Sequence, residues 1–326
     1  MRWLERLAPM LAVVVLPLSP IDACAQSGPK AARIEFVVTD NEARAGPIVE
    51  AFRTGMREFG HVEGESYVLK MHYAEGQVDR IPQLVQSALE RRPDVLVAGN
   101  FIAARVAKEA TRTIPIVGAS CGLEVLVDTL PRPGGNLTGV TCQSVDLAAK
   151  QLQLLREAVP SAQRLAVLSD PSSPYGHLTL SGLRAAAEQL GVQLIEVPVR
   201  HLSEYGGAMA TIRGSGAQAV FIAPDTELFA RRRELMLSLR TNRLPTIGFF
   251  RDFADVGALM SYSANRSERF HRLAWYADRI LKGAKPGELP IDQPTRFELV
   301  INLGTARELG ITLPSTLLLR ADQLIQ

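Results

Sequence analysis

Short apolar runs alternate with longer amphipathic segments from Arg33 onward. Residues 33–38 are apolar and β-branched, which predicts a strand. Residues 47–59 carry apolar side chains at a helical spacing and stop at Gly60, which predicts a helix. The same alternation continues to about residue 142. The other strands expected in this first series are 67–73, 94–98, 114–117 and 137–141, and the other helices are 78–91, 101–111 and 122–130.

A second series of the same kind follows, and it leads into a tail with a different pattern. In the tail, residues 266–282 predict one long helix and residues 285–290 an extended surface segment. A last strand at 297–301 and a last helix at 304–309 complete the chain. In the second series we expect helices at 145–159, 178–190, 204–213 and 227–240, and strands at 164–168, 193–199, 219–223 and 245–250.

Strands separated by helices of this length are typical of parallel sheets covered on both faces. About five strands precede Cys142 and about four follow it. A single ten-stranded sheet is one alternative, but single cores stop growing near this chain length. We therefore predict an α/β fold with two doubly wound, Rossmann-like lobes. The expected N-terminal lobe is 33–142 plus about 263–292, and the expected C-terminal lobe is 143–262 plus about 293–326.

The first 25 residues have the three-part layout of a secretory signal peptide. A short basic start precedes an apolar stretch at 7–18, and Ala-Cys-Ala at 23–25 offers a cleavage site. We expect cleavage after residue 25, and a periplasmic or other extracytoplasmic protein. A lipid anchor at Cys24 is the alternative, and it is disfavoured because Asp22 fits a lipoprotein box poorly.

Composition and charge exclude several classes of function. The 326 residues are 47% hydrophobic and 21% charged, which is a globular composition. The net charge is only +2 and the longest basic run is 231–233, so nucleic-acid binding is not expected. His61 and His72 are isolated and no Cys-x-x-Cys spacing occurs, so we expect neither a metal site nor a cofactor.

Two cysteines remain after the expected cleavage, Cys121 and Cys142. In an oxidising compartment an even pair is compatible with a disulfide. Two independent buried thiols are the alternative. The spacing alone does not decide between them, because a disulfide depends on geometry.

Residues 118–122 read Gly-x-Ser-x-Gly, the pattern of a serine-hydrolase nucleophile elbow, with Ser120 as the candidate nucleophile. The pattern follows a predicted strand and precedes a predicted helix, but every βα junction supplies that context. A triad needs a downstream histidine, and His177, His201 and His271 are the candidates. No His-Gly-Gly oxyanion motif precedes Ser120. We therefore expect a protein that is not an enzyme and keep the hydrolase as an alternative.

Several ordered blocks carry a family resemblance. Residues 132–139, Arg-Pro-Gly-Gly-Asn-Leu-Thr-Gly, resemble the R-P-G-G-N-x-T-G signature of a family of ABC-transporter substrate-binding proteins related to tryptophan-uptake binding proteins. The resemblance runs from about residue 33 to the C-terminus and implies a type I periplasmic-binding, or Venus flytrap, architecture. The family usually has Asp-Pro-Val where this chain has 120–122, so the relatives' ligand is not carried over. The other matching blocks are 52–60, 62–64, 73–76, 280–286 and 319–322.

In open α/β sheets, ligands bind beyond the carboxyl ends of the strands. With two lobes, we expect the loops at those ends to form one shared cleft. The candidate ligand-binding residues in these loops are Asn41, Asn100, Phe101, Ser120, Ser173, Tyr175, Asp225, Thr226 and Phe250.

Each candidate has an expected role and a structural alternative. Asn100 and Ser120, with nearby backbone N–H groups, are expected to hold a ligand carboxylate, and Asp225 to face an ammonium or hydroxyl group. The tryptophan-binding relatives have an acidic residue at a position that resembles that of Asp225. The aromatic side chains among the candidates would stack on an apolar or aromatic ligand. As alternatives, Asn100, Asp225 and Thr226 are good helix caps, and the aromatic residues are good core residues.

The resemblance implies the extracytoplasmic solute-binding component of an ABC importer. We expect it to capture a small, amino-acid-like or aromatic ligand by closing about crossovers near Cys142, Ser263 and Asp292. The expected partners are the small-molecule solute and a membrane permease, and the expected state is a monomer. A serine hydrolase, and a sensing module that feeds a receptor, are the alternatives.

Overall fold

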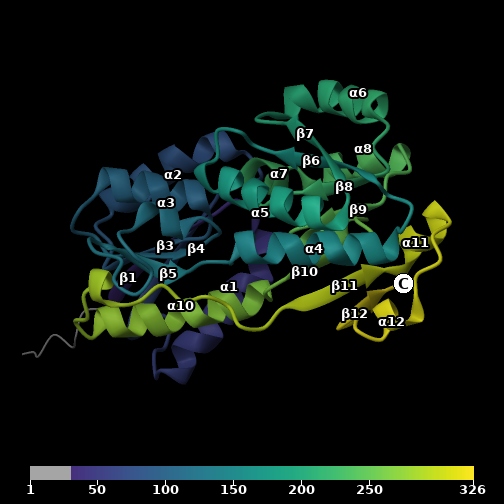
Figure 1. Cartoon of the computed structure of the whole chain (residues 1–326). Helices are drawn as coiled ribbons and strands as arrows, with labels where there is room; N and C mark the ends of the chain where they lie inside the picture. Colours follow the sequence, from purple (N-terminus) through teal and green to yellow (C-terminus); the bar gives the residue numbers. More distant parts are fainter. Residues whose placement is uncertain (1–30) are drawn as a thin grey trace, which may run out of the picture. The chain divides into compact units, whose positions relative to one another are not determined.

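A computed structural model describes residues 31–326, except for the side chains at 174, 175 and 202 (Figure 1). The expected signal peptide and Cys24 lie outside the described residues. Within the described part, no helix has both the length and the apolar character needed to cross a membrane.

The first lobe is built on a five-stranded parallel sheet in the order β2-β1-β3-β4-β5. Its inner strands are largely buried on both faces, as expected for a sheet covered on two sides. The strands are β1 (Ala32–Val38), β2 (Tyr67–Tyr73), β3 (Val95–Ala98), β4 (Ile116–Ala119) and β5 (Leu137–Val140).

Helices α1 (Glu42–Glu58) and α10 (Arg266–Leu281) cover one face of this sheet, and α2 (Ile81–Glu90) and α3 (Phe101–Ala110) cover the other (Figure 1). Phe36 of β1 lies between the two covering helices of the first face. Its ring is 5.7 Å from that of Phe52 in α1 and 5.8 Å from that of Phe270 in α10. The long helix of the C-terminal part therefore belongs to the core of the first lobe. A 3₁₀ turn, η1 (Val78–Arg80), leads into α2.

The second lobe is built on a seven-stranded sheet in the order β12-β11-β10-β9-β8-β6-β7. All neighbours are parallel except β10 and β11. The core on one face includes side chains of α4, α5 and α12, and the core on the other includes side chains of α6 and α8. The strands are β6 (Arg164–Ser169), β7 (Gln193–Pro198), β8 (Ala219–Ile222), β9 (Thr246–Gly248), β10 (Met260–Ser263), β11 (Glu298–Asn302) and β12 (Gln323–Ile325).

The helices of the second lobe include two long ones that pack together, α4 and α5. Of the short 3₁₀ turns, η3 (Leu202–Glu204) belongs to this lobe, whereas η2 (Leu123–Leu126) and η4 (Pro286–Glu288) pack against α3 and β5 of the first lobe. The α-helices are α4 (Ser144–Ala158), α5 (Pro174–Leu190), α6 (Tyr205–Ser215), α7 (Thr226–Ala230), α8 (Arg232–Thr241), α9 (Arg251–Asp255), α11 (Leu303–Leu309) and α12 (Ser315–Leu318).

The predicted fold class is confirmed, and several element predictions are wrong in detail. The helix expected at 122–130 is only the four-residue turn η2, and the helix expected at 227–240 is broken at Arg231 into α7 and α8. Helix α1 begins five residues before Pro47, because Asn41 caps it and the proline is accommodated inside the helix. The short elements α9, α12, β10 and β12 were not predicted, and the β10–β11 pair is antiparallel.

Three segments connect the two sheets. The chain leaves β5 at residues 141–143 to enter α4, leaves β10 at 264–265 to enter α10, and passes from 292 to β11. The first and third segments are hydrogen-bonded together: the Thr141 N–H donates to the Asp292 carbonyl over 3.0 Å, and the Asp292 N–H donates to the Gly139 carbonyl over 2.9 Å. These connections lie beside one another, as a hinge between lobes requires.

Candidate functional site

A cavity lies where the carboxyl ends of strands from both sheets meet. It encloses about 460 Å³ of space not filled by atoms, including the mouth that opens to solvent. The lining residues are Thr39, Gly99, Asn100, Phe101, Ala119, Ser120, Cys121, Pro224, Asp225, Thr226, Phe229, Phe250, Arg266 and Arg269.

Six of the nine candidate ligand-binding residues line this cavity: Asn100, Phe101, Ser120, Asp225, Thr226 and Phe250. As ligand contacts they stay predictions. Asn41 and Ser173 are not among the lining residues. Asn41 caps α1 by accepting from the Arg44 N–H, and Ser173 caps α5 by accepting from the Gly176 N–H. The side chain of Tyr175 lies outside the described part of the chain.

The first lobe contributes two buried polar side chains with unused hydrogen-bonding capacity. Asn100 caps α3, and its Oδ1 accepts from the Ala103 N–H over 2.8 Å. Its Nδ2 group is buried without a partner among the described residues, and so is Ser120 Oγ. Buried polar atoms normally have a partner, so two orphans on one cavity wall indicate a place for a polar ligand group.

The second lobe contributes a buried carboxyl group. Asp225 caps α7, and its Oδ1 accepts from the N–H groups of Glu227 over 2.7 Å and Leu228 over 3.0 Å. Burial raises the pKa of Asp225 to about 6, against the lowering effect of the Leu228 N–H. No described lysine, arginine or histidine forms an ion pair with it. Its second oxygen is left for a ligand donor.

Sequence reasoning missed one aromatic and two cationic members of the cavity wall. Phe229 from α7 meets Phe250 edge to face, with ring centroids 5.4 Å apart. Arg266 and Arg269 come from the first turns of α10, and the Arg266 guanidinium lies over the Phe229 ring at 4.7 Å. Two arginines three positions apart at the start of a helix share a face, which was the available signal.

Behind the cavity, four charged side chains form a network that joins the lobes. Asp40 follows β1, and it accepts from Arg232 of α8 over 2.9 Å and from Arg266 over 3.0 Å. Arg266 also donates to Asp252 of α9 over 3.1 Å. Burial alone would raise the pKa of Asp40, but the guanidinium groups of Arg266 and Arg232 together lower it. Asp40 is therefore ionised at neutral pH.

The Gly-x-Ser-x-Gly pattern has a packing explanation. A Cβ on Gly118 would lie 3.0 Å from Leu123 Cδ2, and Gly122 adopts a positive φ of 85°. No histidine is among the residues that line the cavity, and His271 instead pairs with Glu58 over 3.0 Å on the surface of α10. The described residues therefore assemble no triad around Ser120.

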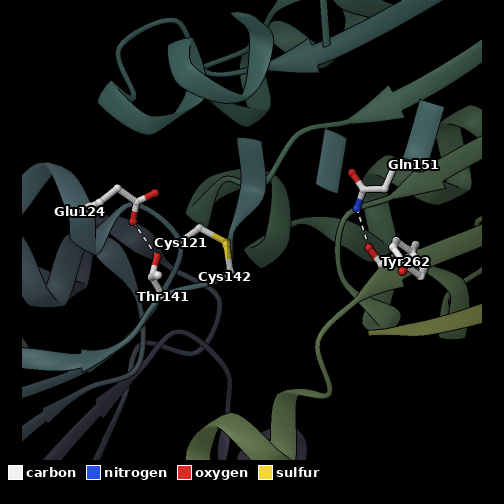
Figure 2. The surroundings of a disulfide bond; sticks show 6 residues. All are labelled: Cys121, Glu124, Thr141, Cys142, Gln151 and Tyr262. Carbon is white, nitrogen blue, oxygen red and sulfur yellow. Dashed lines mark hydrogen bonds between the residues drawn. A yellow bond between two sulfur atoms is a disulfide. The ribbon is translucent and has the colours of Figure 1, made fainter. Parts of the chain in front are cut away.

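A disulfide joins Cys121, in the cavity wall, to Cys142, in the first connection between the lobes (Figure 2). The same region holds two hydrogen bonds that Figure 2 shows. Thr141 donates to Glu124 over 2.6 Å, and Gln151 of α4 donates to the Tyr262 carbonyl over 2.6 Å. The disulfide thus fixes one end of the connection to the loop that carries Ser120. In the described part of the chain, no group of His, Cys, Asp and Glu is arranged to hold a metal ion.

Comparisons with known proteins agree on a family. The model of the family described as ABC transporter substrate binding protein matches residues 36–325. A curated relative from Clostridioides difficile strain R20291, named tyrosine-binding protein, is 20% identical over 324 residues, which cover 94% of this chain and 93% of that protein.

Two solved structures share the fold. A conserved domain protein from Vibrio cholerae superposes with a TM-score of 0.83 at 23% identity, and an ABC domain from Streptococcus pneumoniae in complex with L-Trp superposes with a TM-score of 0.82 at 22% identity. Each comparison covers 90% of this chain and 100% of the other. These likenesses confirm the two-lobed periplasmic-binding architecture.

Proposed function

Because the chain belongs to the ABC transporter substrate-binding protein family, we propose that it is the extracytoplasmic solute-binding component of an ABC importer. The solute is a small amino-acid-like or aromatic molecule, and it binds in the cavity between the two sheets. One observation carries the proposal: strand ends of both lobes meet at a single cavity. The first lobe supplies the unpartnered Asn100 Nδ2 and Ser120 Oγ, and the second supplies the buried Asp225 carboxyl and an aromatic wall.

The wall chemistry supports a ligand of this class. Phe101, Phe229 and Phe250 offer apolar ring surface, which suits an aromatic or aliphatic side chain. Asn100 and Ser120 offer a donor and a hydroxyl for a carboxylate. Relatives carry names that refer to tyrosine and tryptophan. The polar and aromatic groups of this wall suit a ligand of the same chemistry.

Capture works by lobe closure. A ligand that touches groups of both lobes binds the closed form better than the open form and shifts the population accordingly. Micromolar binding requires about 8 kcal/mol of net free energy. Charge-assisted hydrogen bonds and one stacked ring supply contacts of that order. The closed protein, a monomer, then delivers the solute to a membrane permease, and the chain performs no chemical step.

A ligand screen on the chain that starts at residue 26 tests this function. We expect at least one L-amino acid or aromatic acid to raise the melting temperature and to bind with a micromolar or lower Kd by calorimetry. Failure of every amino acid, aromatic acid and small amide to bind would contradict the proposal. So would labelling of Ser120 by a fluorophosphonate with ester turnover.

Two asparagines provide a matched control. Asn41 and Asn100 both cap a helix through Oδ1, with acceptor distances of 3.1 and 2.8 Å, but only Asn100 lines the cavity. Asn41→Ala and Asn100→Ala should each lower the free energy of unfolding by about 1 kcal/mol. Only Asn100→Ala should also weaken ligand binding. Equal ligand affinities in the two variants would remove Asn100 from the site.

A further inference from the structure

Arg269 is a buried cation without a counterion. Only 6% of the residue is exposed, and its Nε is buried without a partner. Among the described residues, no carboxylate forms an ion pair with its guanidinium and no hydrogen bond to it occurs. The centroid of the Phe250 ring lies 5.7 Å from its guanidinium carbon. Arg269 lines the same cavity as Asn100, Ser120 and Asp225.

The neighbouring arginines have the carboxylate partners that Arg269 lacks. Arg232 donates a hydrogen bond to the Asp40 carboxylate over 2.9 Å. Arg266 donates to the carboxylates of Asp40 over 3.0 Å and Asp252 over 3.1 Å. Burial lowers the pKa of Arg269 to about 10, and the positive charge of Arg266 adds to this effect. The charge of Asp252 opposes it, although Asp252 forms no ion pair with Arg269 and pairs with Arg266 instead. The side chain nevertheless carries its charge at neutral pH. A buried, unpaired charge is unfavourable in the empty protein, so its position on a cavity wall indicates that the ligand supplies the anion.

The cavity also contains a negative charge without a cationic partner. Asp225 has a free carboxyl oxygen and no cationic partner among the described residues. Arg269 comes from α10 of the first lobe and Asp225 from the cap of α7 in the second lobe. One cavity therefore holds one uncompensated positive and one uncompensated negative side chain, on opposite lobes.

We propose that Arg269 binds the carboxylate of the ligand, with Asn100 Nδ2 and Ser120 Oγ completing its hydrogen bonds, while Asp225 binds the ligand's ammonium group. The inference rests on the proposed function and deepens it. The solute class becomes free zwitterionic α-amino acids with an apolar or aromatic side chain. Closure then brings two opposite charges of the protein onto two opposite charges of one small molecule.

The position of Arg269 also connects binding to closure. It lies one turn after the connection at 264–265, where the chain passes from β10 of the second lobe into α10 of the first. A carboxylate held there is anchored at the hinge side of the cavity. The ammonium group then reaches Asp225 only when the second lobe has closed. Ligands that lack either charge leave one buried protein charge unpaired, and they are rejected for that reason.

A ligand series on the unaltered chain gives the first test. The panel contains all L-amino acids, the amides of tyrosine, tryptophan, phenylalanine and leucine, and the corresponding acids without the amino group. By calorimetry, we expect the best amino acid to bind at least about 30-fold more tightly than its amide and than its deaminated acid, since each lacks one charge-assisted contact. Amides that bind as tightly as the free amino acids would overturn the inference.

Substitutions give the second test. Arg269→Gln should weaken binding of the best amino acid at least about 30-fold, and Arg269→Lys should weaken it less, because the charge remains while the planar fork is lost. Arg279→Gln is the matched control, since Arg279 is an exposed residue of the same helix whose side chain contacts Trp275. The control should bind with unchanged affinity.

The stability of the empty protein separates a ligand role from a structural one. If Arg269 awaits a ligand anion, Arg269→Gln should leave the melting temperature of the empty protein unchanged or raised, because an unpaired buried charge has been removed. A large fall in that temperature, with ligand affinity unchanged, would overturn the inference and assign Arg269 to the fold. A chain that binds only neutral or cationic solutes would overturn it while leaving the solute-binding function intact. If nothing in the panel binds, both proposals fail.

Discussion

Arg232 Nη2 of the second lobe lies 2.9 Å from Asp40 Oδ1 of the first lobe, although 192 positions separate the two residues in the sequence. Both side chains are almost fully buried, with 5% and 2% of their surface exposed. Arg266 holds the other oxygen of Asp40 and also reaches Asp252, so the pair belongs to a network that bridges the lobes. Such a network exists only when the two lobes are in contact, so in the proposed closure cycle it would stabilise the closed form.

Asp40→Asn should therefore shift the protein toward the open form. The variant leaves Arg232 and Arg266 short of a counterion in the closed state, whereas opening returns them to water. We expect ligand affinity to fall by about 30-fold, or about 2 kcal/mol, and the radius of gyration of the empty protein to rise in X-ray scattering.

Glu109→Gln provides the control for this experiment. Glu109 pairs with Arg105 over 3.1 Å on the exposed face of α3, where ion pairs contribute little. The control should differ from the unaltered protein by less than about 0.5 kcal/mol. If Asp40→Asn and the control have the same affinity and scattering curve, the network does not stabilise closure.

The buried carboxyl of Asp225 gives a pH dependence with a definite sign. Its pKa is raised by burial from 3.8 to about 6 in the folded protein. Between pH 4 and pH 6 the folded state thus binds more protons here than the unfolded state, so stability falls as pH rises. Above the pKa of the folded state, the free energy of unfolding has fallen by its full amount, on the order of 3 kcal/mol. Below pH 4 this contribution disappears.

Chemical denaturation of the ligand-free protein at several pH values measures this effect. Other groups titrate in the same range, so the informative quantity is the difference in the free energy of unfolding between Asp225→Asn and the unaltered chain. The asparagine keeps an acceptor for the cap and does not ionise. The difference should increase in favour of the variant from pH 4 to pH 6.5. A flat difference would show that the folded pKa of Asp225 is close to its ordinary value.

The sequence was sufficient for the fold class and for the strand ends at which the cavity lies, because both follow from local patterns. The alternation of apolar runs and amphipathic segments indicated parallel sheets, and ligands in such sheets bind beyond the strand ends. The family match confirms the resemblance found in the motifs. Asn100, Ser120 and Asp225 all follow strands, and all three line the cavity.

The sequence could not separate cavity residues from helix caps, nor could it pair distant charges. Asn41 and Asn100 give the same local signal, an asparagine between a strand and a helix, and they differ only in where the tertiary fold places them. Arg266 contacts Asp40 across 226 positions, which no local pattern encodes. Arg269 was missed for the related reason that α10 follows a short strand that was not predicted, β10.

The disulfide should stabilise the protein and the cavity wall. It closes a loop with a sequence separation of 21 residues, for which the chain-entropy model gives about 3 kcal/mol. We expect unreduced peptide mapping by mass spectrometry to find Cys121 and Cys142 linked. A reductant should lower the free energy of unfolding of the unaltered chain by roughly 3 kcal/mol. The double variant Cys121→Ala, Cys142→Ala should not respond to the reductant. Two free thiols in the purified protein would contradict the linkage.

Gly139 should be the least replaceable glycine of the family-signature segment at 132–139. A Cβ there would lie 2.0 Å from the Gly118 carbonyl oxygen, and its φ of 140° disfavours other residues. Gly139→Ala must push β4 and β5 apart next to the Ser120 loop. We therefore expect the free energy of unfolding in denaturant to fall by more than about 3 kcal/mol, together with weaker ligand binding.

Gly207→Ala provides the control. Gly207 in α6 has nothing within 4 Å of its Cβ position, so this variant should be neutral or stabilise by up to about 1 kcal/mol. Equal stabilities of the two variants would show that the strands do not approach as closely as the structure has them.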